Sequence, residues 1–200
     1  MTRIWMVRHG ESLLNAAHRL QGWSDAPLTA RGVEQASARA GDFARLGVRF
    51  DAVVSADGIR HRQTARVLAP EAERAEDEDW REICFGALEG AKVRKVSGML
   101  ARFRDTADPM REVLLALAAR DIGAEHPDVV VARASAALER AAGLGDEVLV
   151  VTSGITKMLL LGALGGDLSR VTGGPSNLSV STLDGAPGAW TVTRAVVDEL

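Results

Sequence analysis

The sequence lacks the features that disulfide-bonded, membrane-spanning and general nucleic-acid-binding proteins need. Cys84 is its one cysteine, so an internal disulfide is excluded and nothing demands an oxidising compartment. No apolar run reaches the roughly 18 residues of a membrane-spanning helix, and the N-terminus lacks a signal-peptide pattern. Lys and Arg number 24 against 27 Asp and Glu, and the net charge of −3 disfavours a general nucleic-acid binder. We expect a soluble, cytoplasmic protein without a membrane or nucleic-acid partner.

The 200 residues suffice for one domain with a sizeable core, and no repeat or linker divides them. Short, apolar, β-prone segments alternate with segments whose apolar residues recur at helical spacing. This order predicts a three-layer α/β/α fold with a mostly parallel central sheet, and the last two strands predict a hairpin at its edge. The expected strands are 3–7, 51–55, 148–151, 178–183 and 190–196, and the expected helices run from Thr29 to Gly47, from Ile59 to Leu68, from Pro127 to Gly143 and around 158–161.

Two segments in the middle of the chain carry opposite charge. Residues 71–82 hold seven acids and two bases, whereas residues 91–111 hold six bases and two acids. Val96, Met99, Leu100 and Phe103 lie at helical spacing, so the basic segment predicts an amphipathic helix. Its basic face is either an ordinary solvated surface or part of a cap that attracts an anionic substrate.

Polar residues follow the predicted strands where each strand ends. Arg8 and His9 follow the first strand, Arg60 lies one turn into the helix after the second, and Ser153 and Gly154 begin the helix after the strongest strand. Ligands bind at the carboxyl ends of strands in a parallel α/β sheet. Two arginines, a histidine and the N–H groups of a helix N-terminus at one edge predict a phosphate-binding site.

Several motifs, taken in their order along the chain, are typical of one protein family. They are Arg-His-Gly-Glu-Ser at 8–12, Asn15, Gln-Gly-Trp-Ser-Asp-Ala-Pro-Leu-Thr at 21–29, Arg-Gly-Val-Glu-Gln-Ala at 31–36, the segment 55–65 with Arg60, and the segment 82–90 from Glu82 to Gly90. The chain resembles the histidine phosphatase superfamily, which includes the cofactor-dependent phosphoglycerate mutases. The resemblance spans nearly the whole chain and implies one phosphoglycerate mutase-like domain over 1–200, with a helical cap at about 84–126.

The resemblance also implies catalytic roles. His9 is the expected nucleophile, which attacks phosphorus through a neutral imidazole nitrogen and forms a phosphohistidine. Arg8 and Arg60 are expected to hold the phosphoryl oxygens. Glu82 is expected to protonate the leaving oxygen and then to activate water. The alternative for Glu82 is that it is one more acid of the acidic segment.

Four further residues are expected to contact the substrate: Asn15, Gln21, Gly22 and Gly154. The resemblance implies no cofactor and no metal. The four histidines and Cys84 show no metal-ligand spacing, which agrees with that expectation. The expected partner is a small phosphorylated substrate.

The chain departs from the family pattern after the strand 148–151. The resemblance places a second catalytic histidine there, in a Ser-His-Gly-Gly pattern, and Ser153 stands in its position. A serine hydroxyl donates one hydrogen bond but carries no positive charge, and losing one such donor costs roughly 10²–10³ in rate. Lys157, one turn further on, could restore some charge but is expected on the surface. His61 is expected on the helix surface or behind the catalytic residues.

The sequence therefore predicts a metal-independent phosphomonoesterase that acts on a small phosphate ester through His9. A catalytically impaired phospho-ligand-binding protein, which keeps Arg8 and Arg60 but has lost turnover, is the first alternative. A phosphoglycerate mutase-type phosphotransferase is the second. The family's mutases are longer chains with extra basic residues in the middle, so the short segment 91–126 makes this alternative weaker.

Overall fold

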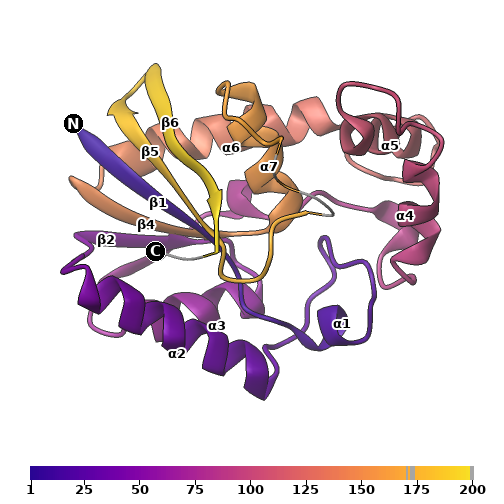
Figure 1. Cartoon of the computed structure of the whole chain (residues 1–200). Helices are drawn as coiled ribbons and strands as arrows, with labels where there is room; N and C mark the ends of the chain where they lie inside the picture. Colours follow the sequence, from indigo (N-terminus) through magenta and orange to yellow (C-terminus); the bar gives the residue numbers. More distant parts are fainter. Residues whose placement is uncertain (170, 172–173, 199–200) are drawn as a thin grey trace.

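The computed structural model describes residues 1–169, 171 and 174–198, which form a six-stranded sheet between two layers of helices (Figure 1). The strand order is β3-β2-β4-β1-β5-β6; strands β1 to β4 pair in parallel, and β5 and β6 pair antiparallel at one edge. The predicted α/β/α architecture with its edge hairpin is confirmed. The strands are Thr2–Arg8 (β1), Ala52–Ser55 (β2), Arg74–Glu76 (β3), Glu147–Thr152 (β4), Val180–Ala186 (β5) and Ala189–Val197 (β6).

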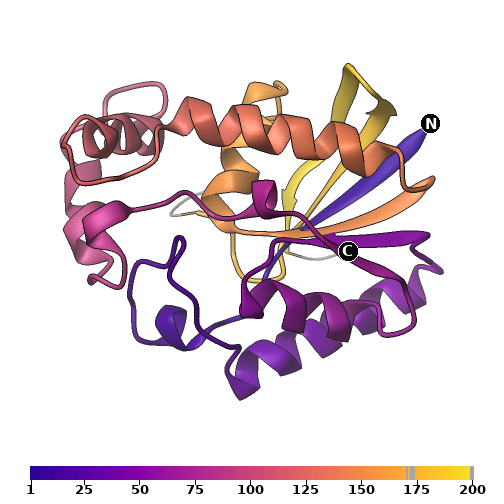
Figure 2. The ribbon, with the colours of Figure 1, turned by 180° about the vertical axis from the view of Figure 1, so that it is seen from behind.

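Helices cover both faces of this sheet. Helices α2 and α3 lie on one face, and α6 and α7 lie on the other, as Figure 2 shows from behind. Helices α4 and α5 lie beyond the end of the sheet, on the side where β1 and β4 end (Figure 1). The helices are Leu13–Ala16 (α1), Ala30–Arg45 (α2), Ile59–Leu68 (α3), Arg94–Leu100 (α4), Pro109–Ala118 (α5), Pro127–Ala142 (α6) and Gly154–Ala163 (α7), with 3-10 turns at Glu78–Trp80 and Gly86–Leu88.

The two faces of the central strands are both buried because each strand alternates between them. On β1, Ile4 and Met6 pack into the core under α6 and α7, whereas Trp5 and Val7 pack into the core under α2 and α3. Strand β4 does the same with residues 148–151. Successive side chains of a strand point to opposite faces, so an unbroken apolar run indicates a strand covered on both sides.

Two local features differ from the sequence pattern. Strand β3 lies within the acidic segment, where three exposed residues give no apolar signal, and it forms because its backbone pairs with β2. Helix α4 ends at Leu100 rather than continuing through Phe103. Turns follow over 101–107, and the next helix begins with Asp108 as its cap and Pro109 in its first turn.

Candidate active site

His9 leaves the carboxyl end of β1, the strand next to β4. Its backbone N–H donates to the carbonyl of Thr152 at 3.0 Å, and the N–H of Gly10 donates to the Thr64 hydroxyl at 3.0 Å. The ring Nδ1 lies 2.8 Å from the Gly10 carbonyl. A carbonyl only accepts, so Nδ1 carries the proton and Nε2 keeps its lone pair. The local fold therefore provides a nucleophilic nitrogen at Nε2.

Gly10 is required by the close approach of two backbone segments. A Cβ atom on Gly10 would lie 2.6 Å from the carbonyl oxygen of Gly32 near the start of α2. A Cβ on Gly32 would in turn lie 2.1 Å from the carbonyl oxygen of Glu11. Both distances are below van der Waals contact, so a side chain at either position would push the loop after His9 away from α2.

The surroundings of His9 keep its imidazole neutral. The side chain is buried, and burial lowers its pKa well below 6.5, with the positive charges of Arg60 and Arg8 lowering it further. Desolvation and a neighbouring cation both disfavour imidazolium. His9 is therefore uncharged at neutral pH, which is the form that can attack phosphorus.

Arg60, on the first turn of α3, is held from one side by backbone carbonyls. Its Nη2 donates to Gly22 at 2.8 Å and its Nη1 to Ser24 at 3.2 Å. Arg8 is held in a similar way, since its Nη1 donates to the carbonyl of Pro175. The buried Nε atoms of both arginines have no hydrogen-bond partner among the described residues. Two guanidinium groups with unpaired N–H donors have the chemistry needed to bind a phosphate anion.

Burial and charge act in opposite directions on these two arginines. Burial lowers the pKa of both guanidinium groups, and the negative charge of Glu82 raises it. An arginine remains protonated in proteins despite such shifts. The three side chains therefore lie within electrostatic reach of one another, with Glu82 balancing part of the positive charge.

Glu82 is held by the N-terminus of α7. Its Oε2 accepts from the N–H of Ile155 at 3.0 Å, and its Oε1 accepts from the N–H of Thr156 at 2.9 Å, from the Thr156 hydroxyl at 3.1 Å and from the N–H of Ile83 at 3.0 Å. These helix N-terminal N–H groups point toward the carboxyl group and fix its position. The expectation that the N–H groups of α7 bind phosphate is wrong for these two, since a carboxylate occupies them.

Glu89 organises the loop that holds Arg60, a role that the sequence analysis missed. Its carboxylate accepts from the N–H groups of Gly22, Trp23 and Ser24 at 3.1, 2.9 and 3.0 Å. Burial raises the pKa of Glu89, but the hydrogen bonds from Ser24 and from the loop backbone outweigh it, and the pKa lies below the ordinary value. Glu89 belongs to the motif at 82–90, so its place in that motif was the available signal.

The polar loop after His9 brings in the expected substrate-binding amides. Asn15 Oδ1 accepts from Ser12 N–H at 3.4 Å and from Asn177 Nδ2 at 3.3 Å, and Asn177 Nδ2 also donates to the His9 carbonyl at 2.8 Å. Gln21 accepts from the Ser12 hydroxyl, while its buried Nε2 has no partner among the described residues. Asn177 is a second residue whose place the sequence analysis did not assign.

Ser153 and Gly154 lie at the end of β4, beside His9 and Arg8. Ser153 is fully buried, and its Oγ lies 2.7 Å from Nε2 of His61. A Cβ on Gly154 would lie 3.4 Å from Nε of Arg8, so this glycine packs against the guanidinium. The side chain of His61 is buried with 1% exposure and its ring centroid lies 5.0 Å from that of His9, so of the two expected positions the helix surface is excluded and the one behind His9 remains.

Lys157 is also buried, and the expectation of a surface lysine is wrong. Its Nζ donates to the carbonyl of Ser179 at 2.7 Å and to the Ser179 hydroxyl at 3.2 Å. Burial lowers its pKa well below the ordinary value, and the charge of Arg8 lowers it further. The residue lies on the inner side of α7, where the sheet covers it, and it ties the helix to the start of β5.

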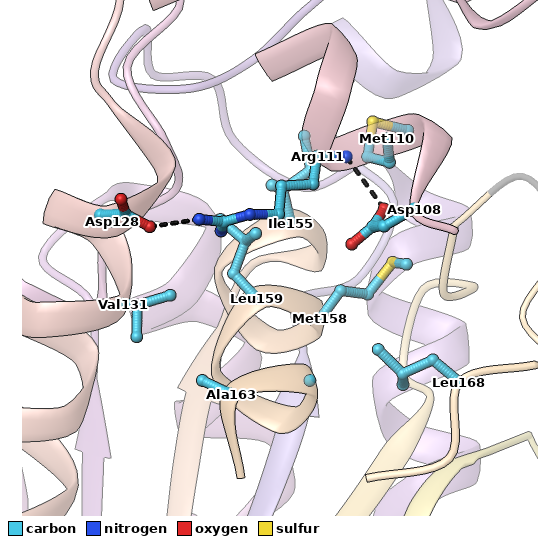
Figure 3. Close-up of a pocket in the computed structure, with 11 residues that line it drawn as sticks. Asp108, Met110, Arg111, Asp128, Val131, Ile155, Met158, Leu159, Ala163 and Leu168 are labelled. Carbon is cyan, nitrogen blue, oxygen red and sulfur yellow. Dashed lines mark hydrogen bonds and ion pairs between the residues drawn. The ribbon is translucent and has the colours of Figure 1, made fainter. Parts of the chain in front are cut away.

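Two cavities lie near this end of the sheet. One, of about 280 Å³, is lined by Arg60 and His61 together with Gly22, Trp23, Asp25, Asp57, Gly58 and Arg81. The other, of about 390 Å³, lies between α5, α6 and α7, and Arg111 and Asp128 form an ion pair at its edge (Figure 3). None of the predicted site residues lines the second cavity. The first cavity is therefore the one that adjoins Arg60 and His61.

Within the described part of the chain, no group of three or more His, Cys, Asp or Glu side chains is arranged to hold a metal ion. No helix in that part of the chain has both the length and the apolar character needed to cross a membrane.

Comparison with known proteins identifies the family of this chain. The family model of the histidine phosphatase superfamily (branch 1) matches residues 4–198. The chain belongs to this superfamily. GpmB of Escherichia coli O1:K1, named a probable phosphoglycerate mutase, is 30% identical over 213 residues, covering 99% of this chain and 92% of GpmB.

Solved structures share the fold of this histidine phosphatase family member. A phosphoglycerate mutase from Bacillus anthracis superposes with a TM-score of 0.83 at 27% identity, over 96% of this chain and 92% of the other. The alpha-ribazole phosphatase from Shigella flexneri superposes with a TM-score of 0.73 at 20% identity, over 100% of this chain and 98% of the other, and shows the same fold.

Proposed function

We propose that this chain is a phosphomonoesterase that uses His9 as its nucleophile and needs no metal ion. The observation that carries the proposal is the 2.8 Å contact of His9 Nδ1 with the Gly10 carbonyl, which leaves Nε2 with its lone pair on a buried ring within electrostatic reach of Arg60 and Arg8. A neutral imidazole nitrogen beside two guanidinium groups suits attack on a phosphate ester, because the cations balance the charge of the transferring group.

In the first step, His9 Nε2 attacks phosphorus and the bond from phosphorus to the ester oxygen breaks. Arg8 and Arg60 hold the non-bridging oxygens, and the leaving oxygen takes a proton from Glu82. Glu82 Oε2 accepts one hydrogen bond, from Ile155, so a lone pair remains at which this proton is held. The products of the step are a free alcohol and a phosphohistidine.

In the second step, Glu82 takes a proton from a water molecule, whose oxygen attacks phosphorus. The bond from phosphorus to Nε2 breaks, inorganic phosphate leaves, and His9 and Glu82 return to their starting states. One carboxyl group thus acts first as acid and then as base. Its attachment to α7 keeps it in one position through both steps.

A phosphotransferase is the second candidate, because GpmB and the Bacillus anthracis protein carry the name of phosphoglycerate mutase. In that case the phosphohistidine returns its phosphoryl group to another hydroxyl group of the substrate instead of to water. The two candidates share the first step and differ in the acceptor. Phosphorus NMR of the products separates them, since a phosphatase releases inorganic phosphate and a mutase releases an isomeric ester.

The test is hydrolysis of an aryl phosphate by the purified protein without added metal, with His9→Ala beside it. We expect turnover in the parent and none in His9→Ala. The exposed His126, which caps α6, provides a control: His126→Asn retains a capping side chain and is expected to keep the parental rate. Turnover in His9→Ala near the parental rate would remove His9 as nucleophile. Saturable vanadate binding without turnover in the parent would indicate a phospho-ligand-binding protein.

A further inference from the structure

His61 is a buried imidazole inside the site that the proposed reaction does not use. Its ring and the ring of His9 lie nearly perpendicular, at 88°, with centroids 5.0 Å apart. Its Nε2 lies 2.7 Å from Oγ of Ser153, and its Nδ1 has no hydrogen-bond partner among the described residues. Burying a polar ring is unfavourable unless its nitrogens are used, so this position calls for an explanation.

Ser153, which His61 contacts, lies close to the expected position of the phosphoryl group. Strands β1 and β4 are parallel and pair Arg8 with Thr152, so His9 and Ser153 leave the two strands at the same edge. The next residue, Gly154, packs against the guanidinium of Arg8. The hydroxyl of Ser153 therefore lies beside the place where His9 and Arg8 would hold a phosphoryl group.

The chemistry of a hydroxyl group determines what His61 can do there. A hydroxyl has one proton to donate and two lone pairs, and it rotates to suit its partners. When Nε2–H of His61 donates to Oγ, the Ser153 proton must point to a different acceptor. A phosphoryl oxygen bound beside His9 is such an acceptor, and each hydrogen bond in a chain of this kind strengthens the next.

We propose that His61 is a positioning residue for phosphoryl transfer: its Nε2–H donates to Oγ of Ser153, and the Ser153 hydroxyl donates to an oxygen of the phosphoryl group on His9. This inference rests on the proposed function. Ser153 stands where the family resemblance expects a histidine, and α3 supplies an imidazole to the same place from another segment. The pair thus shares the hydrogen bonding expected of one side chain.

The test compares kcat for an aryl phosphate in the parent, His61→Ala, Ser153→Ala and the double variant. Losing a hydrogen bond to a charged group typically costs about 10- to 100-fold, so we expect each single variant to lose about that much. The double variant is expected to lose no more than the worse single variant, because both residues act through one hydrogen bond. His61→Gln keeps an N–H at a similar reach and is expected to recover part of the loss.

A swapped variant provides a second test that does not depend on the single variants. His61→Ala with Ser153→His removes one ring and introduces another beside the space that it leaves. We expect this variant to recover kcat to within about tenfold of the parent, whereas Ser153→His alone is expected to be slower and less stable because the two rings would overlap. Parental kcat in His61→Ala, or a double-variant loss equal to the product of the single losses, would overturn the proposal.

Vanadate binding, measured by calorimetry, separates this proposal from the proposed function. If the parent binds vanadate without turnover and His61→Ala weakens binding about tenfold, the hydrogen-bond chain stands and the phosphatase proposal fails. If the parent turns over through His9 while His61→Ala and His61→Gln keep parental kcat and vanadate affinity, only the role of His61 fails. If the parent neither turns over nor binds vanadate, both fail. His126→Asn is the matched control in every arm.

Discussion

The ends of strands β1 and β4 are neighbours in the sheet, but they acquire their chemistry in different ways. At the end of β1, Arg8 and His9 are adjacent in the sequence and carry the guanidinium and the proposed nucleophile themselves. At the end of β4, Ser153 carries only a hydroxyl, and the groups around it come from elsewhere: the imidazole of His61 from α3 and the carboxylate of Glu82 from the segment after β3.

Two consecutive residues of helix α3 lie near the ends of the two strands. Arg60 adds positive charge beside His9, and His61 contacts Ser153. A site at adjoining strand ends can therefore be completed from a third segment, provided that this segment begins at the same edge of the sheet.

The largest expected effect comes from Arg60→Leu, which removes a guanidinium from the β1 end. An arginine that balances the charge of a transferring phosphoryl group contributes about 10³–10⁵ in kcat, so we expect a loss of that order, well beyond the loss in His61→Ala. Arg62, on the same helix, pairs with Glu76 and its side chain is 41% exposed, so Arg62→Leu is the matched control with little expected effect. Steady-state kinetics that give similar losses of kcat for Arg60→Leu and His61→Ala would show that the two strand ends contribute equally.

The next effect is on stability at acid pH. Burial holds the pKa values of His9 and His61 well below 6.5, while an unfolded histidine takes up a proton near pH 6.5. Below about pH 6.5 the unfolded state therefore binds more protons, and the free energy of unfolding falls as the pH drops. The slope is about 1.4 kcal/mol per pH unit for each histidine until the folded protein itself takes up the proton.

Urea unfolding at pH 7.5, 6.5 and 5.5 measures this slope. His61→Gln is expected to have a shallower slope than the parent because one of the two buried imidazoles is absent. Equal slopes in the parent and His61→Gln would show that the imidazole of His61 takes up protons in the folded state as readily as in the unfolded one.

The smallest expected effect concerns the basic segment outside both strand ends. Lys92, Arg94 and Lys95 are exposed, so replacing all three with Gln is expected to raise KM for an anionic ester about two- to fivefold at low salt, and to flatten its salt dependence. Arg49→Gln, in the loop between α2 and β2, is the control. An unchanged KM at all salt concentrations would mean that this face is an ordinary solvated surface.

Sequence patterns predicted the fold and the position of Arg8 and His9 at the end of β1. An apolar run at 148–151 and helical spacing after Thr29 depend on local periodicity, and Thr29 indeed caps α2 by accepting from the N–H of Gly32. Strand β3 could not be found in this way, because it is held by backbone pairing to β2 and buries no side chain.

Buried polar residues were the harder part of the prediction. His61 lies among polar neighbours in the sequence and Lys157 is a lone lysine, and both features favour a solvated position. Both are buried because the faces that carry them meet the sheet and the ends of β1 and β4, and a partner is available there: Ser179 for Lys157 and Ser153 for His61. Burial of a polar group depends on such a partner, which a single segment does not specify.

The sequence by itself determined the α/β layering, the motif that places Arg8 and His9 at a strand end, and the family to which the chain belongs. Each of these depends on residues that are close together in the chain. The tertiary structure decided that Glu82 binds the N-terminus of α7, that Glu89 holds the loop under Arg60, and that His61 meets Ser153. These contacts join distant segments, so their geometry exists only after the helices have packed on the sheet.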